Sequence, residues 1–345
     1  MKKEYIIPIF VPNYGCENDC VFCNQEKISG KKSGVTAKDV KETIEYYLKN
    51  FKDDNKYVEV AFFGGSFTGI DEETQNELLE AANEYIKTKK VNSIRISTRP
   101  DYIDKHILKR LKKYNVKTIE LGVQSSNDYI LEKSNRGHTF EDVKRASKMI
   151  RWHRFNLGHQ MMVGLPDSTR LDELNTARDL IKLKPKMVRI YPVLVIKGTK
   201  LAKEFASGEY EPLTVDQAVD RCKEITSLFR KKKIDVRRIG LQTTDEITFK
   251  DKDGSQVLAG PFHPAFRQLV EGDMWYDSLQ EKIKEINTKA KKVEIIVNPE
   301  DSNNVIGHRK TNIKRLQDLY EIEIVVTPKE DLGQGKFEIN VLETY

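Results

Sequence analysis

Three of the chain's four cysteines lie within eight residues, in the stretch "GCENDCVFCNQ". Cys16, Cys20 and Cys23 follow a C-x3-C-x2-C pattern directly after an apolar run. Thiolates are soft ligands that suit iron–sulfur clusters, and a four-iron cluster normally takes four of them. With three thiolates one iron keeps an open position, which is typical of a reactive metal site rather than a structural one. The spacing therefore predicts a loop around a 4Fe-4S cluster with one open iron.

Two other interpretations of the cysteines remain open at this point. A zinc ion could be held by the three thiolates and a histidine from elsewhere, although the first histidine in the chain is His106. A C-x-x-C redox pair would use Cys20 and Cys23, but it leaves Cys16 without a role and lacks a thioredoxin-like context. The cluster is the interpretation that the spacing favours.

The composition fits a globular protein in a reducing compartment. The chain has 345 residues, 38% hydrophobic and 32% charged, with a net charge of +6 that allows an anionic partner without requiring one. Four cysteines, one of them isolated, do not make a disulfide framework. The apolar run near the N-terminus is too short for a signal peptide, and no later run has the length of a membrane span. We therefore expect a cytoplasmic location and no membrane partner.

The elements that must position the cysteines alternate between strands and helices. Helical patterns begin at Thr36, Asp71, Thr139 and Thr214. Such alternation predicts an α/β fold with a parallel sheet, and six units fit a partial (β/α)6 TIM-like barrel, with its chemistry at the carboxyl ends of the strands. The predicted strands are 5–11, 58–63, 93–97, 118–123, 158–163 and 187–196.

The barrel pattern fades near residue 242, which predicts three segments. We expect the partial barrel over 1–242, a connecting extension of the core over 243–292, and a small α+β module over 293–345. Within that module, 293–297 and 321–326 have strand patterns, and 304–320 is predicted to form a turn and a helix.

The cysteine loop and a glycine pair resemble a known family. C-x3-C-x-aromatic-C, with Phe22 at the aromatic position, resembles the signature of radical S-adenosylmethionine (radical SAM) enzymes. "FFGGSFTG" is similar to that family's glycine motif, in which Gly64 and Gly65 let the backbone approach the cofactor. Glu commonly follows the glycines. Ser66 stands there in this chain, similar to the Gly-Gly-Thr variant of the Elongator catalytic subunit and the oxygen-independent coproporphyrinogen dehydrogenases.

Further motifs resemble the Elongator catalytic subunit in the same order, so that the resemblance covers residues 5 to about 242. They are "STRPDYI" (97–103), "ELGVQS" (120–125), "NRGHTFEDVKRA" (135–146), "HQMMVGLP" (159–166) and "RIYPVLVIKGTKL" (189–201).

The resemblance implies a function and a set of site residues. In radical SAM enzymes the open iron binds S-adenosyl-L-methionine, and the reduced cluster cleaves it to a 5′-deoxyadenosyl radical that abstracts hydrogen. An electron donor such as flavodoxin or ferredoxin is implied as a partner. Taken one by one, the same residues also fit strand-end polar groups or core aliphatics. The implied cofactor contacts are Phe22, Gly64, Gly65, Ser66, Ser97, Gln124, Arg136, Gln160, Val195 and Ile196, and the implied cluster ligands are Cys16, Cys20 and Cys23.

The end of the chain differs from the Elongator subunit. About a hundred residues follow the barrel pattern, and they contain no acetyl-CoA phosphate-binding loop, so an acetyl-CoA-dependent reaction is not expected. "VIGHRKTNIKRL" instead resembles a KH-type RNA-binding module, whose G-x-x-G loop meets phosphates at a helix start. A solvated appendage is the alternative. The candidate RNA contacts are Gly307, His308, Arg309, Lys310, in the place of the second glycine, and Lys314.

Three functions are consistent with these patterns. The favoured one is a radical SAM enzyme that modifies RNA, with tRNA as the preferred substrate class. A radical SAM enzyme acting on a small molecule or a protein is the second, and a non-catalytic RNA-binding protein with a structural cluster is the third. Cys222 lies in a helical pattern, where a lone cysteine usually packs in the core.

Overall fold

The computed structural model describes residues 3–11, 19–24, 34–53, 55–241, 247–249, 254–286 and 290–345. The chain divides into two compact units. The first comprises Met1–Thr214 with Ile225–Phe262, and the second Val215–Glu224 with His263–Tyr345. None of the helices in the described ranges combines the length and the apolar composition that a bilayer span requires.

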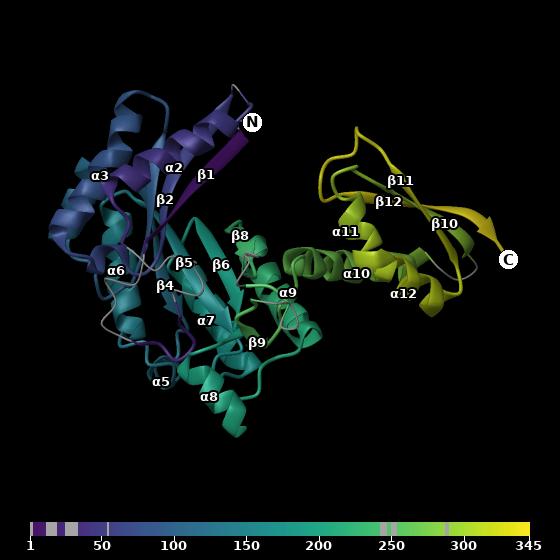
Figure 1. Ribbon diagram of the computed structural model, residues 1–345. Coiled ribbons are helices and arrows are strands. Elements are labelled where there is room, and N and C mark those ends of the chain that lie inside the picture. The colour runs from purple at the N-terminus through teal and green to yellow at the C-terminus, as the bar shows by residue number, and fades with distance from the viewer. Residues whose placement is uncertain are drawn as a thin grey trace. The chain divides into compact units, whose positions relative to one another are not determined.

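The first unit is built on a seven-stranded parallel sheet in the order β1-β2-β3-β4-β5-β6-β8 (Figure 1). Each pairing between neighbouring strands is parallel, so all the carboxyl ends lie at one edge of the sheet and all the amino ends at the other. The strands are β1 (Lys3–Val11), β2 (Lys56–Gly64), β3 (Ser93–Thr98), β4 (Val116–Gln124), β5 (Asn156–Val163), β6 (Met187–Pro192) and β8 (Asp235–Ile239).

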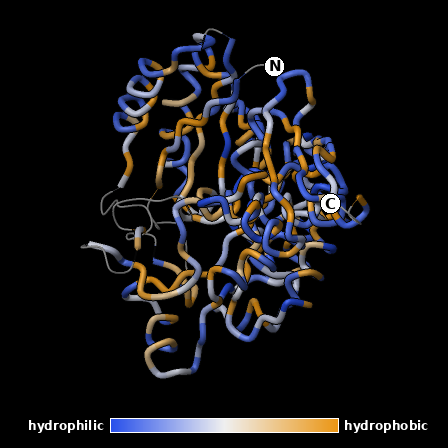
Figure 2. The backbone as a smooth tube through the Cα atoms, turned by 90° about the vertical axis from the view of Figure 1, so that its right-hand side faces the viewer, coloured by the Kyte–Doolittle hydropathy of each residue, from blue (hydrophilic) through white to orange (hydrophobic). Residues whose placement is uncertain are grey.

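Amphipathic helices connect these strands, and their colour in Figure 2 alternates between hydrophilic and hydrophobic along each turn. Thr36, Thr139 and Thr169 each begin a helix with a capping box, in which the hydroxyl and an Asp three residues later satisfy free backbone N–H groups. The helices of this unit are α2 (Ala37–Asn50), η1 (Phe67–Gly69), α3 (Glu72–Lys87), α4 (Lys105–Lys113), α5 (Asp128–Lys133), α6 (Phe140–Trp152), α7 (Arg170–Lys182) and α8 (Lys200–Ser207), and α9 (Val215–Lys231) is shared between the units.

The predicted α/β class and partial TIM-like barrel are confirmed, with two differences in detail. The described part of the sheet has seven strands rather than six, because β8 extends it beyond β6. The predicted strand 187–196 is divided. β6 ends at Pro192, which has no N–H for the ladder, and β7 (Val195–Ile196) pairs antiparallel with β9 (Val257–Ala259).

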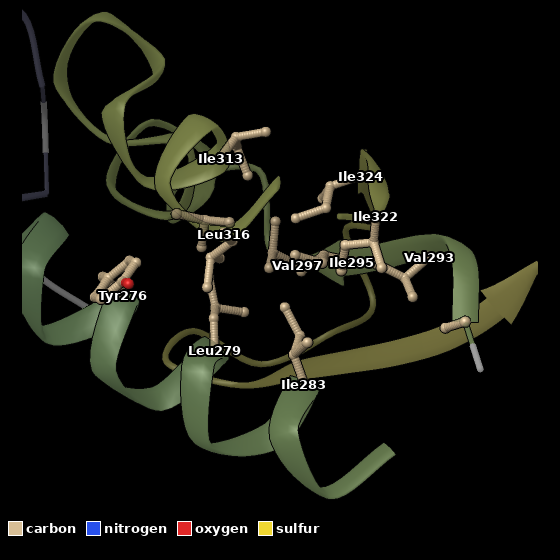
Figure 3. Close-up of a cluster of buried hydrophobic side chains, with 12 residues drawn as sticks. Tyr276, Leu279, Ile283, Val293, Ile295, Val297, Ile313, Leu316, Ile322 and Ile324 are labelled. Carbon is tan, nitrogen blue, oxygen red and sulfur yellow. The ribbon is translucent and has the colours of Figure 1, made fainter. Parts of the chain in front are cut away.

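The second unit packs helices against a three-stranded sheet in the order β11-β10-β12. The central strand pairs parallel with β11 and antiparallel with β12. Figure 3 shows side chains of α10, α12, β10 and β11 converging in one buried apolar cluster, which includes Leu279, Ile295 and Leu316. The elements are α10 (Phe266–Ile286), β10 (Ala290–Val297), α11 (Ser302–Ile306), η2 (His308–Lys310), α12 (Thr311–Tyr320), β11 (Glu323–Pro328) and β12 (Phe337–Thr344).

A turn divides two helices where the sequence predicted a turn and a single helix over 304–320. The short helix α11 ends at Gly307, whose φ is +78°, and α12 begins at Thr311. A Cβ at Gly307 would lie 2.8 Å from the side chain of Asn312, so glycine is required there both by its backbone conformation and by its surroundings. Cys222 lies on α9 and is completely buried.

Candidate functional site

A cavity of about 520 Å³ opens in the first unit. Side chains that follow or end strands β1 to β6 line much of it, at the carboxyl edge where barrel enzymes carry their chemistry. Most of its wall is apolar or aromatic, including Phe10, Phe63, Tyr191 and Leu194. Six polar side chains and one glycine also line it, namely Cys23, Ser97, Gln124, Gln160, Arg189, Arg238 and Gly64.

One of the three clustered cysteines, Cys23, lies at this cavity, and Cys16 lies outside the described residues. Cys23 lines the cavity, whereas Cys20 is only 5% exposed. The backbone between them is tied to other elements, because Val21 N donates to Ser134 O at 3.2 Å and Leu201 N donates to Val21 O at 2.8 Å. These bonds hold the cysteine loop in place from both sides.

Arg136 lies against the sulfur of Cys20 rather than among the residues that line the cavity. Its Nη1 is 3.2 Å from Cys20 Sγ, and its Nη2 donates to Gly122 O at 2.7 Å. Its Nε is buried and has no hydrogen-bond partner among the described residues. A donor held beside a sulfur orients it, as the groups around a metal ligand do.

The glycine pair joins the end of β2 to the end of β1. Gly64 ends β2 opposite Val11, and Gly65 N donates to Val11 O at 3.1 Å. Gly64 has φ +109°, and a Cβ there would lie 2.4 Å from Val11 O. Only glycine therefore permits the close approach of β2 to the last residue of β1 before the cysteines.

Ser66 has a structural environment. It is 3% exposed, its Oγ lies 2.8 Å from Thr98 Oγ1, and Arg99 N donates to it at 3.0 Å. Neither Ser66 nor Gly65 is among the described residues that line the cavity. The structure thus places Ser66 where it ties the glycine motif to the end of β3.

A glutamine at the cavity is held by two neighbours. Gln160 Nε2 donates to Ser97 Oγ at 3.2 Å and to Glu120 Oε2 at 3.1 Å. Both bonds fix which way the amide faces, because a carboxylate only accepts. The sequence analysis named Gln160 and Ser97, and the structure brings them together.

A buried ion-pair network that the sequence motifs did not indicate lies beneath these residues. Arg95 Nη1 lies 2.6 Å from Glu120 Oε1, and its Nη2 also pairs with Glu59. Arg189 Nε lies 2.7 Å from Glu120 Oε2, and its guanidinium lies over the ring of Phe63 at 4.7 Å. The available signal was the occurrence of charged residues inside otherwise apolar strands, where burial requires a partner.

Charge pairing sets the ionisation of this network. Burial opposes the charge on Glu120, but the guanidinium groups of Arg189 and Arg95 outweigh it and hold the pKa of that carboxyl below its ordinary value. Burial likewise opposes the charge on Arg189, and Glu120 outweighs it, so that the pKa of the guanidinium is raised. Glu120 and Arg189 therefore stay charged around neutral pH.

Gln124 has a buried acceptor atom that a ligand could satisfy. It lines the cavity, its backbone is left-handed with φ +71°, and its buried Oε1 has no hydrogen-bond partner among the described residues. A buried acceptor without a partner is costly unless a ligand completes it. Ile196 and Phe22 also line the cavity, whereas Val195 is buried in the apolar cluster behind it.

The candidate RNA residues lie in the second unit, around the turn between α11 and α12. Arg309 and Lys310 both have left-handed backbones, with φ of +54° and +64°. Gly307 and His308 line a separate cavity of about 490 Å³, together with Arg315, which also pairs with Asp273 at 2.9 Å. Lys314 is exposed on α12.

Comparisons with known proteins agree with this geometry. The profile of the radical SAM superfamily matches residues 10–180, and the profile of the radical SAM C-terminal domain matches residues 185–276. An uncharacterised protein of Methanocaldococcus jannaschii, MJ0486, is 31% identical over 229 residues, which are 63% of this chain and 70% of that protein.

Other relatives match more locally. The tRNA uridine(34) acetyltransferase of M. jannaschii is 30% identical over 183 residues, and human Elongator complex protein 3 is 29% identical over 192. These alignments cover 47% and 50% of this chain but only 34% and 35% of the relatives, so the chain spans about a third of their length.

A solved structure shows the same fold. The Elp3 of Methanocaldococcus infernus, lacking its residues 1–46, superposes with a TM-score of 0.61 and 22% identity, over 82% of this chain and 64% of that one. Enzymes of the radical SAM superfamily use a 4Fe-4S cluster and S-adenosylmethionine. By its two matching profiles, its relatives and its half-barrel, this chain belongs to the radical SAM superfamily.

Proposed function

We propose that this chain binds a 4Fe-4S cluster and S-adenosyl-L-methionine and uses the resulting 5′-deoxyadenosyl radical to modify RNA, with tRNA as the substrate class. The observation that carries the cofactor part is the convergence, at one cavity, of the cysteine loop, the glycine motif and the unpaired acceptor of Gln124. A zinc site or a C-x-x-C redox pair, the two other interpretations of the cysteines, would not account for all three features.

The residues present fit both groups. Thiolates of Cys16, Cys20 and Cys23 are the donor set that iron–sulfur clusters require, and three of them leave one iron for a second ligand. The acceptor Oε1 of Gln124 and the amide of Gln160 would suit polar groups of an amino acid or a ribose. When bound, these groups supply a carbon-centred radical that removes a hydrogen atom from a substrate.

The chain's own residues do the positioning. Arg136 holds Cys20 through a hydrogen bond to its sulfur, and Glu120 holds Gln160 through a hydrogen bond to its amide. The apolar side chains of the cavity, such as Phe10, Phe63 and Leu194, exclude water from the space beside the cysteines. Exclusion of water protects a reactive species from side reactions.

Two features support RNA as the substrate. Relatives named as tRNA uridine(34) acetyltransferases are 30% and 32% identical to this chain over aligned stretches of 183 and 156 residues. The turn at Gly307 in the second unit lies between two helices and is followed by Arg309 and Lys310, which suits a phosphate backbone. A flavodoxin or a ferredoxin is the proposed electron donor, because the cluster must be reduced before the cofactor is cleaved.

The cofactor part is tested by anaerobic reconstitution with iron and sulfide, followed by reduction in the presence of S-adenosylmethionine. We expect 5′-deoxyadenosine from the wild-type protein and none from Cys20→Ala. Cys222→Ala is the matched control, because it also removes a buried thiol and should keep full production. A bound zinc ion, or a cluster whose paramagnetic spectrum ignores the added cofactor, would contradict the proposal.

The substrate part is tested in two ways. In the first, deuterium transfer between cofactor and RNA is followed, with cofactor deuterated at the 5′ position or with unlabelled cofactor and deuterated RNA. The second compares nucleosides. Nucleosides from tRNA of cells with and without the gene are compared by mass spectrometry. We expect one nucleoside to change, and we expect purified protein to restore it. Production of 5′-deoxyadenosine that is stimulated by metabolite or protein fractions and never by RNA would favour the second function instead.

A further inference from the structure

Five turns lead from a helix into the amino ends of β3, β4, β5, β6 and β8. They span 87–92, 109–117, 148–156, 182–187 and 230–234, and we call them together the basic edge. They contain eighteen Lys and Arg residues and no Asp or Glu. Because the chain carries a net charge of +6, the rest of it carries a net charge of −12. The positive charge of this protein is therefore concentrated at one edge of the first unit.

The basic edge is continuous. Its strands are direct neighbours in the sheet, in the order β3-β4-β5-β6-β8. Neighbouring turns also contact each other, because Lys112 Nζ donates to His153 O at 3.2 Å and Arg151 Nη1 donates to Leu183 O at 3.4 Å. Its charges consequently form one surface rather than five separate spots.

These charges face solvent. All of the Lys and Arg side chains of the basic edge are exposed except Arg110, which is largely buried. Within the middle turn, Trp152 is 78% exposed between Arg151 and Arg154. An indole in water beside cations is unfavourable for an isolated protein and suits a partner that offers both a flat apolar face and negative charge.

In these turns, basic residues occupy left-handed backbone positions that favour glycine. Each turn stops its helix with a left-handed residue, with φ between +54° and +64°. These residues are Lys89, Asn115, Arg154, Lys184 and Lys233. Glycine is the usual residue at this position, and an L-residue there costs roughly 1 kcal/mol. The helix dipole accounts for cations in the last turn of a helix, but not for basic side chains at a position that favours glycine.

We propose that the basic edge binds the phosphodiester backbone of the RNA substrate, with Trp152 stacking on an exposed base. The inference rests on the proposed RNA function and adds a second holding site to it. An acidic electron-donor protein fits this surface less well. It must reach the cysteine loop, and strands of six to nine residues put about 20–30 Å between the two edges of the sheet.

The test combines Lys89→Gly, Arg154→Gly, Lys184→Gly and Lys233→Gly, which remove four charges at positions where glycine fits the backbone. Binding of fluorescently labelled, unfractionated tRNA to the full reconstituted chain is followed by anisotropy without S-adenosylmethionine or reductant. We expect the Kd to rise more than tenfold. We also expect the slope of log K against log salt concentration to fall by about 2 to 4, since each lost phosphate contact removes roughly 0.7 to 0.9.

A matched variant removes four exposed lysines from other surfaces. Lys38→Gln, Lys203→Gln, Lys282→Gln and Lys336→Gln change the net charge by the same amount and lie outside the basic edge. Little change in Kd is expected from this variant. Equal weakening by both variants would overturn the proposal, because general attraction would then account for binding.

Trp152→Ala separates stacking from charge. It should weaken tRNA binding about five- to a hundredfold while leaving the salt slope unchanged. The four-glycine variant could keep tRNA binding but lose binding to a purified flavodoxin or to phosphatidylserine vesicles. That result would overturn the proposal in favour of those partners. Binding is measured without turnover. Failure of RNA modification with intact basic-edge binding therefore counts against the proposed function alone.

Discussion

The interior of the seven-stranded sheet and its amino edge use charge in opposite ways. Within the sheet, Glu59, Arg95, Glu120 and Arg189 are buried and paired within hydrogen-bond distance. At the amino edge, eighteen basic residues stand in five turns that contain no acidic residue, and some of them pair with acids of nearby helices, as Lys87 does with Glu80. The same sheet thus carries a buried, paired polar network inside and an exposed positive surface at its amino edge.

The backbone shows the same contrast. At the carboxyl edge the left-handed position of β2 is taken by Gly64, where no side chain would fit. At the amino edge the left-handed positions are taken by Lys89, Lys184 and Lys233 although glycine would fit better. Packing dictates the residue at the first edge. At the second, the packing does not account for the basic residues, and the proposed RNA-binding surface would account for them.

Breaking the buried network should have the largest effect on stability. Glu120→Ala leaves Arg95 and Arg189 buried without their shared carboxylate, and this costs about 3–5 kcal/mol of unfolding free energy. Urea denaturation followed by circular dichroism measures the loss. Glu84→Ala, which removes an exposed partner of Lys41, should cost less than about 1 kcal/mol. Similar losses from both variants would show that the network is not the rigid part of the site.

Gly64→Ala tests whether packing controls the residue type at the carboxyl edge. The added methyl lies 2.4 Å from Val11 O in a backbone conformation that L-residues avoid, so we expect a loss of about 2–4 kcal/mol. Gly254→Ala is the control, because it has a positive φ of +83° but no atom within 4 Å of the added methyl. It should cost about 1 kcal/mol. Iron content after reconstitution should fall only in the first variant, since Val11 directly precedes the cysteine loop.

The contrast between the edges also explains what the sequence could predict. The half-barrel followed from apolar runs separated by capped helices, and thiol spacing together with Gly64 pointed to the carboxyl edge. The pairing of Arg95 with Glu120 joins different strands, so no local pattern contains it. The break after Pro192 and the short helix before Gly307 depend on strand partners and side-chain contacts far away in sequence.

The contacts of Arg136 illustrate the same limit. Its position in a motif implied that it lies near the cofactor. A motif, however, does not show which atoms a side chain contacts. Only the fold shows that its guanidinium reaches Cys20 Sγ and Gly122 O. The basic edge is present in the sequence as separate runs, and one of them, 230–233, lies at a predicted helix end where the helix dipole already favours cations. Once the parallel strands bring the five turns together, these separate runs form one basic surface.

Two buried histidines, His159 on β5 and His138 before α6, predict a loss of stability at mildly acidic pH. Burial lowers the pKa of His159 to about 3, and burial together with the charges of Arg136 and Arg99 lowers the pKa of His138 to about 3. The unfolded chain binds protons at these groups as the pH falls through about 6.5, while the folded chain stays unprotonated until about 3. Stability is therefore lost as the pH falls, by about 1 kcal/mol for each histidine at pH 5.5.

Urea denaturation at pH 7.5 and pH 5.5 measures this loss. His159→Gln should remove about half of the difference between the two pH values, and His138→Gln the other half. Carboxylates such as Glu120, whose pKa is lowered in the folded chain, lose their contribution only at lower pH and do not confuse the result. A wild-type stability that stays constant from pH 7.5 to pH 5.5 would contradict the burial of neutral histidines.

The smallest expected effect concerns the amino edge. Lys184→Gly relieves a left-handed lysine but gives the unfolded chain more freedom, so unfolding free energy should rise by less than about 1 kcal/mol. Lys186→Gly removes the same charge two residues later, where φ is not positive, and should lower it by a similar amount. Thermal unfolding of the two variants side by side compares them. If the two substitutions change the unfolding free energy in opposite directions, the lysine at position 184 is present despite its unfavourable backbone conformation. An interaction with a partner outside the folded chain is then its physical reason.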